Sequence, residues 1–302
     1  MAAIALIWAG GFPATKYCLQ AGLSVGALLS IRFAIGTAGL GLMLVLLKVK
    51  LRRRDMLDGL WLGLVLATLF WLQTDGLRFT TTSKSGFITG LYVIFTPMVA
   101  LIIGDRLRPS HGLGALVAMV GLTLLVREPG QAWGGWNRGD SQTLLAAVLC
   151  GFHIVMTSHF SRRSSGWVLA FMQVVVTGAV SVAITLALPA PHGFQGAGVA
   201  LGQPGTWVAL VFMGVLATSL AFYVQSTMQA RLGATESGIL MSMEPVWTAV
   251  IAISGFVPGI REHLSPLQFL GGLFILAATL LAELGPRLMR RLAPIEAEDV
   301  IG

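Results

Sequence analysis

Residues 105–109, which read DRLRP, are matched 157 positions later by residues 262–266, which read EHLSP. A glycine follows both stretches at the same distance, Gly114 in the first case and Gly271 in the second. Two further pairs match at a similar offset: 65–68 with 215–218 (VLAT), and 85–86 with 237–238 (SG). The chain therefore contains an internal duplication, which constrains the fold more than any single segment does.

The repeated unit is apolar almost throughout. Hydrophobic residues make up 55% of the 302 residues and charged residues 11%, whereas a soluble domain carries about a quarter charged residues. A helix needs about 20 mostly apolar residues to cross the hydrocarbon layer. The sequence predicts ten such spans, near 2–21, 25–47, 59–78, 84–104, 109–127, 142–160, 166–189, 206–229, 235–257 and 267–286. This composition excludes a water-soluble protein and predicts an all-α membrane protein.

Five spans in each half is an odd number, so the two copies must enter the membrane with opposite orientations. Inverted repeats of this kind are typical of secondary transporters. We expect a first repeat at 1–130, an outer loop at 131–141, a second repeat at 142–286 and a cytoplasmic tail at 287–302.

The net charge of +7 is distributed unevenly along the chain. If the first span leaves the cytoplasm, 13 of the 20 Lys and Arg residues fall on the inner side and five on the outer side. This bias predicts cytoplasmic termini in an inner (plasma) membrane protein, and we interpret the basic stretch 48–54 as part of it rather than as a nucleic-acid or headgroup site. The first span lacks a cationic leader, so we expect a membrane helix and not a signal peptide.

Four motifs recur at characteristic places along the spans: residues 8–12 (WAGGF) with Lys16, the segment from Thr82 to Pro97, residues 104–107 (GDRL) and Glu244-Pro245. In their order and spacing, these motifs resemble the EamA-type branch of the drug/metabolite transporter superfamily. The resemblance implies ten helices in a five-plus-five inverted arrangement around a central cavity. It also implies alternating access and export of amino acids or other metabolites, as in the YddG-like exporters.

A polar stripe runs along the fourth span. Ser85, Thr89, Tyr92 and Thr96 follow an i, i+4, i+7, i+11 spacing, which aligns them on one helical face. Adding 152 to each number gives the matching positions Ser237, Met241, Glu244 and Thr248. Polar side chains in a span face protein or a water-filled cavity. The stripes predict a cavity lining, although single hydroxyls also join helices to one another.

Glu244 is the leading functional candidate because a charge near the bilayer centre costs about 3 kcal/mol. It could bind a substrate ammonium, exchange a proton, or pair with Lys16; the structural alternative is a protonated or hydrogen-bonded Glu beside Pro245. We expect Lys16 and Arg32 either to act in the site or to extend to the interface, and Asp75 to be structural.

The predicted substrate-binding set combines the stripe with other polar and aromatic residues of the spans. Its members are Glu244, Tyr92, Thr89, Ser85, Lys16, Trp71, Gln73, His153, Trp247 and Thr248. His153 could equally be a core histidine or a proton carrier, and the aromatic residues could serve packing alone. Gly11, Pro13, Pro97 and Pro245 interrupt their spans and are candidate hinges or static kinks.

Other function classes are less consistent with the sequence. We find no phosphate-binding loop of an ATP-driven pump and no HExxH metal motif, and Ser85 and Ser237 lack the context of a catalytic serine. A passive channel or uniporter is the main alternative, and an intramembrane enzyme a weaker one. We expect a monomer with no cofactor, no metal, no disulfide between Cys18 and Cys150 and no nucleic-acid partner, with protons as the candidate coupling ion.

Overall fold

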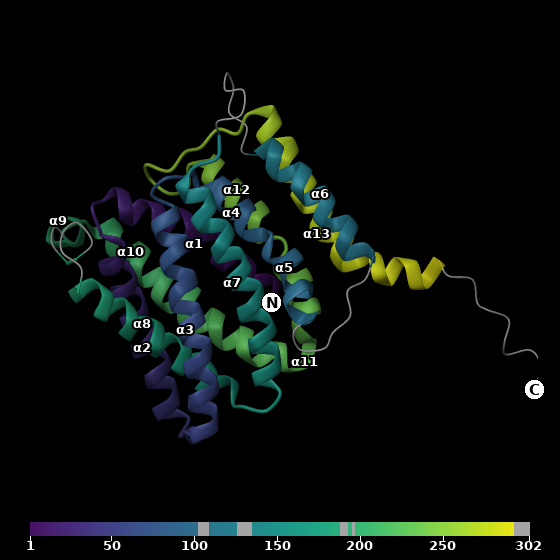
Figure 1. Ribbon diagram of the computed structural model, residues 1–302. Helices are drawn as coiled ribbons and strands as arrows, with labels where there is room; N and C mark the ends of the chain where they lie inside the picture. The colour runs from purple at the N-terminus through teal and green to yellow at the C-terminus, as the bar shows by residue number, and fades with distance from the viewer. Residues whose placement is uncertain (102–108, 126–134, 188–192, 195–196, 293–302) are drawn as a thin grey trace, which may run out of the picture.

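The computed structural model describes residues 1–101, 109–125, 135–187, 193–194 and 197–292, and the described residues form helices and short connections (Figure 1). The elements in chain order are α1 (Ala2–Gln20), α2 (Val25–Leu46), α3 (Arg53–Gly76), α4 (Thr82–Gly90), α5 (Tyr92–Ala100), α6 (Pro109–Leu125), α7 (Arg138–Ser161), α8 (Gly166–Ala187), α9 (Ala197–Leu201), α10 (Pro204–Val211), the π-helix η2 (Phe212–Leu220), α11 (Ala221–Met241), α12 (Glu244–Ser254) and α13 (Pro266–Leu292). The predicted all-helical membrane fold is confirmed.

Five helical segments are long and apolar enough to cross a membrane unaided: Val25–Leu46, Arg53–Gly76, Arg138–Ser161, Gly166–Ala187 and Pro204–Leu232. Gly112–Leu125, Glu244–Ser254 and Pro266–Leu281 are shorter apolar helices. Helix starts follow local chemistry, since the Ser24 side chain accepts a hydrogen bond from the amide of Ala27 at the start of α2. Pro204 and Pro266 stand at the first positions of α10 and α13, where a missing N–H is tolerated.

The predicted fourth span, 84–104, is two helices rather than one. α4 ends at Gly90 and α5 begins at Tyr92, with Leu91 between them. Gly90 lies directly against the ring of Pro245, where a Cβ atom would collide. The close helix crossing requires glycine, and glycine in turn weakens the helix at this point.

The second half contains the matching break. α11 ends at Met241 and α12 begins at Glu244, so the interruption includes Met243, which is Leu91 plus 152. Tyr92 and Glu244 consequently hold the same position, each as the first residue of a second half-helix. Membrane helices of this broken form occur where the freed backbone groups face protein or a cavity.

The predicted boundary between spans eight and nine, at 229 and 235, is wrong. α10, η2 and α11 follow one another without a break from Pro204 to Met241. Residues 230–234 read ARLGA, and one glycine among good helix formers costs only about 1 kcal/mol, too little to end a helix. Figure 1 shows α11 at the lower edge of the bundle and α12 beside α4 near the top.

Packing between the halves is reciprocal. α3 packs against α7 and α8, and the matching helix of the second half, α10–η2–α11, packs against α1 and α2. α4 and α5 pack against α7, as α12 packs against α1. α2 with α8 and α6 with α13 each pair with their own counterpart, and the contact of α4 with α12 is matched by that of α11 with α5. Exchanging the halves therefore preserves the contacts, as an inverted repeat requires.

Candidate functional site

A cavity lies where the two halves meet, lined by residues of both. Its wall is contributed by α1, α2, α3, α4, α5, α7, α11 and α12. Apolar side chains predominate, with aromatic rings from Trp8, Phe12, Phe70 and Phe222. Its larger polar side chains are Arg32, Gln73, Tyr92, His153, Gln225 and Glu244.

Half of the predicted substrate-binding set lines this cavity: Glu244, Tyr92, Thr89, Gln73 and His153. The stripe explains most of them, because Thr89, Tyr92 and Glu244 were selected by helical periodicity and by the repeat. Gln73 donates a hydrogen bond from Nε2 to Thr89 Oγ1 over 3.1 Å, which fixes α3 against α4. Gly11, a candidate hinge, also lines the cavity.

The other five predicted residues lie away from the cavity wall: Ser85, Lys16, Trp71, Trp247 and Thr248. Thr248 packs against Gly86 and donates to the carbonyl of Glu244 over 2.9 Å, so it joins α12 to α4. Trp247 is 39% exposed, as expected for a side chain that faces lipid. Trp71 packs against the main core cluster, and Ser85 is fully buried within α4.

Of the remaining candidate hinges, Pro13 and Pro97 lie inside α1 and α5. Pro245 lies in the first turn of α12, on Gly90.

Lys16 does not pair with Glu244. Its Nζ donates to the carbonyl oxygens of Leu77 and Thr80, at 2.7 and 2.9 Å. Leu77 lines the cavity, so Lys16 fixes the connection between α3 and α4 at one end of the cavity. The alternative in which the two residues hold span one against span nine is therefore not observed.

Glu244 begins α12 and is 8% exposed. Among the described residues, no group donates a hydrogen bond to its carboxylate and no cation lies within ion-pair distance. A buried acceptor without a protein donor is costly, which favours a ligand ammonium or a bound proton as its partner.

Gln225 is a second acceptor on the cavity wall that the sequence analysis missed. It is 2% exposed, and its Oε1 has no hydrogen-bond partner among the described residues. Its signal in the sequence was a pair of glutamines, Gln225 and Gln229, in an apolar span, which periodicity alone does not distinguish from packing. Together with Glu244, it offers two acceptors to a donor-rich ligand.

His153 is already satisfied by protein. Its Nε2 lies 2.8 Å from Gln173 Oε1, and Gln173 Nε2 donates to Ser226 Oγ over 3.1 Å. Because the amide oxygen only accepts, Nε2 carries the proton in this arrangement. This chain links α7, α8 and α11 and supports the core-histidine alternative over the proton carrier.

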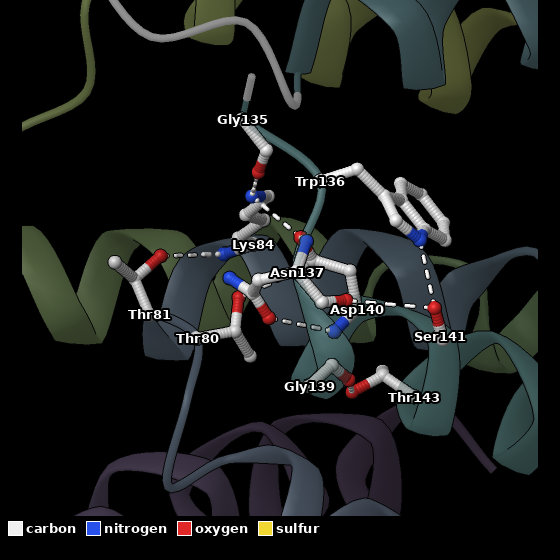
Figure 2. A network of polar contacts seen from close by, with 10 residues as sticks. All are labelled: Thr80, Thr81, Lys84, Gly135, Trp136, Asn137, Gly139, Asp140, Ser141 and Thr143. Atoms are coloured by element: carbon white, nitrogen blue, oxygen red, sulfur yellow. Dashed lines mark hydrogen bonds and ion pairs between the residues drawn. The ribbon is translucent and has the colours of Figure 1, made fainter.

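A buried polar network, which we call the latch, lies where the connection between α3 and α4 meets the start of α7 (Figure 2). Lys84 Nζ forms an ion pair with Asp140 Oδ2 over 2.7 Å, and both residues are buried. Thr80 donates to Asp140 Oδ1 over 2.7 Å. Asp140 also closes a capping box with Asn137 at the start of α7. The latch therefore joins α4 to α7.

Glu262 adds a connection from the second half. Its carboxylate accepts from the backbone amides of Thr82 and Ser83, the latter over 2.8 Å, at the N-terminus of α4. A negative charge is favourable at this position because the amides there lack helical partners and the helix dipole is positive. Glu262 belongs to the EHLSP repeat; its counterpart Asp105 lies outside the described residues.

The end of the helix bundle opposite the latch carries the basic stretch 48–54, and we call it the basic end. An ion pair of a different kind lies there. Arg163 donates from Nε and Nη2 to the carboxylate of Asp58 at 3.0 and 2.6 Å, and Ser164 Oγ donates to it over 2.7 Å. This bidentate hydrogen bond with Asp58 raises the pKa of Arg163. The pair fixes the α7–α8 connection to the start of α3.

Comparison with known proteins agrees with this architecture. The model of the EamA-like transporter family matches residues 1–127 and again 137–284. An uncharacterized transporter of Archaeoglobus fulgidus is 30% identical over 94% of this chain and 84% of its own length. The aromatic amino acid exporter YddG of Ancylobacter novellus is 25% identical over 69% of this chain and 70% of its own length. A crystal structure matches with a TM-score of 0.64 at 18% identity, over 95% of this chain and 97% of that one, which shows the fold alone.

Proposed function

Since the chain belongs to the EamA-like transporter family, we propose that this membrane transporter exports amino acids or related small metabolites by alternating access. The family also establishes that the protein is not an enzyme. The observation that carries the proposal is a cavity between inverted halves whose wall includes Glu244, a carboxylate with no donor or cation partner among the described residues. The name of the Ancylobacter relative supports the substrate class.

In the proposed cycle, the two halves exchange conformations around the cavity. The breaks at Leu91 and Met243 lie at matching positions and next to the cavity residues Tyr92 and Glu244. Local bending there would change the end at which the cavity opens. Glu244 would hold a substrate ammonium in one orientation and a proton in the other, so that proton movement drives export.

The proposed orientation places both termini and the basic end in the cytoplasm, on the basis of the positive-inside bias. Arg54 at the basic end and Arg261 at the latch end are both exposed, so each can be replaced by cysteine. An impermeant thiol reagent added to intact cells should label Arg261→Cys and leave Arg54→Cys unlabelled. The reverse pattern would invert the proposed topology.

The function is tested by flux into proteoliposomes from a panel of labelled amino acids and metabolites, with and without a proton gradient. We expect Glu244→Gln to reduce flux at least tenfold or to abolish its dependence on pH between about 5 and 8. Asp55→Asn is the matched control, because Asp55 is a buried carboxylate that does not line the cavity. Unchanged flux and pH dependence in Glu244→Gln would remove Glu244 from the mechanism. Ion conductance in a planar bilayer would indicate a channel and contradict the proposed transporter.

A further inference from the structure

Arg32 lines the cavity instead of extending to the interface. It lies eight residues after Ser24 in α2, about 12 Å along the helix axis, and is 4% exposed. The hydropathy pattern did not predict this, because an arginine within two or three turns of a helix end can reach water by its length. In the structure its side chain turns to the bundle interior.

Only one of the three guanidinium nitrogens of Arg32 has a hydrogen-bond acceptor among the described residues. Nε donates to Thr218 Oγ1 over 3.0 Å, and Cζ lies 4.5 Å from the centre of the Phe70 ring. No carboxylate of the described residues pairs with it, and neither terminal nitrogen donates to a described residue. Thr218 belongs to the π-helix η2, a type of segment that occurs often at functional sites.

The matching position of the second half shows what a purely structural residue does there. Gln173 lies eight residues after Ser165, just as Arg32 follows Ser24, on the helix α8 that pairs with α2. Its side chain is fully buried, and its amide oxygen and nitrogen are taken by His153 and Ser226. In the second half, protein groups therefore satisfy the side chain at this position, whereas in the first half the side chain is a cation that lines the cavity.

We propose that Arg32 is the anchor for a carboxylate group of the transported molecule. The two terminal nitrogens of a guanidinium match the two oxygens of a carboxylate, which gives a charge-assisted bidentate pair. Glu244 and Gln225 supply acceptors elsewhere on the same wall. A ligand with one carboxylate and one ammonium thus neutralises both buried charges, and this inference rests on the proposed function of the cavity.

A phosphate monoester fits less well. It carries about −1.5 to −2 charge at neutral pH, and Arg32 is the one cation on the cavity wall among the described residues. Phosphate would leave excess negative charge in an apolar cavity that also contains Glu244. A carboxylate balances Arg32 one to one.

The experiment measures binding to the purified full-length protein in nanodiscs by the shift in its unfolding midpoint with ligand concentration. The probes are L-phenylalanine and L-phenylalaninamide, L-leucine and L-leucinamide, and 3-phenylpropionate with phenyl phosphate. Each amide keeps the ammonium and loses the carboxylate. We expect the wild type to bind each acid about tenfold more tightly than its amide, and Arg32→Gln to reduce that ratio to about one.

Arg32→Lys retains the positive charge but lacks the two parallel terminal nitrogens. Its acid-to-amide affinity ratio should therefore fall between that of the wild type and that of Arg32→Gln. Arg53→Gln, at an exposed position of the basic end, should keep the wild-type ratio. Since the ratio is measured within one variant, loss of folded protein does not affect it. An unchanged ratio in Arg32→Gln, equal binding of acid and amide by the wild type, tighter binding of phenyl phosphate, or no binding of any probe would overturn the inference. If the ratios behave as expected but proteoliposomes show no flux, the proposed function fails and the Arg32 site stands.

Discussion

The two ends of the helix bundle each carry an ion pair, but the pairs differ in burial. In the latch, the side chains of Lys84 and Asp140 are 6% and 0% exposed. At the basic end, the side chains of Arg163 and Asp58 are 40% and 8% exposed. A buried pair that loses one partner leaves an unsolvated charge, whereas a partly exposed pair loses little. The latch is therefore expected to hold its helices together more firmly, and the contact at the basic end to separate at much lower cost.

The largest effect should follow from Asp140→Asn, which leaves Lys84 buried without its counter-charge. We expect a loss of about 3–5 kcal/mol in the free energy of unfolding, measured by denaturation in detergent. Replacing both partners, as Lys84→Met with Asp140→Leu, should recover most of that loss. If the single variant is no less stable than the double variant, the latch pair is not buried as described.

A smaller effect is expected from Glu262→Gln, which removes the charge from the carboxylate that caps α4. Loss of this charge-assisted cap should cost about 1–2 kcal/mol in unfolding free energy. Arg261→Gln, at the exposed neighbouring residue, serves as the control and should cost far less. Equal losses in the two variants would show that Glu262 contributes no more than an ordinary surface charge.

The smallest effect should come from Asp58→Asn at the basic end. We expect a loss of at most about 1 kcal/mol, reduced further by high salt. The raised pKa of Arg163 means that its charge is present at all pH values below arginine's ordinary pKa and is lost only above it, so the pair persists wherever Asp58 is also ionised. Stability changes between about pH 5 and 9 should therefore not arise from Arg163. A loss as large as that of Asp140→Asn would erase the difference between the two ends.

The positions of the spans and the inverted repeat were predictable because they depend on apolar length and on matching segments. Thr89, Tyr92 and Glu244 were found for a related reason: helical periodicity fixes which side chains share a face. Pro245 indicated an interruption near the break at Met243, but the break at Leu91 was not predictable, because it depends on the crossing of Gly90 with Pro245, residues far apart in sequence. The continuous helix through 230–234 was missed because the spans were placed by apolar length, which does not show whether two consecutive spans share one helix.

The polar residues of the cavity were predictable only in part. Burial beside partners distant in sequence decided the roles of Lys16, His153 and Arg32, and such contacts have no local signature. Lys16 donates to backbone carbonyls, and His153 forms a hydrogen bond with Gln173. Arg32 donates from Nε to Thr218, while its two terminal nitrogens donate to no described residue. For Arg32 the sequence left two roles open, in the site or at the interface, and the structure places it in the cavity wall.

The contact between Gly90 and Pro245 has a mechanical consequence. It joins the end of α4 to the start of α12, within two residues of the break in each helix. Because no side chain separates the backbone of Gly90 from the ring of Pro245, a displacement of one helix cannot be absorbed by a change of side-chain rotamer at this contact. We therefore expect movement at one break to be passed to the other, which would favour opening to one side of the membrane at a time.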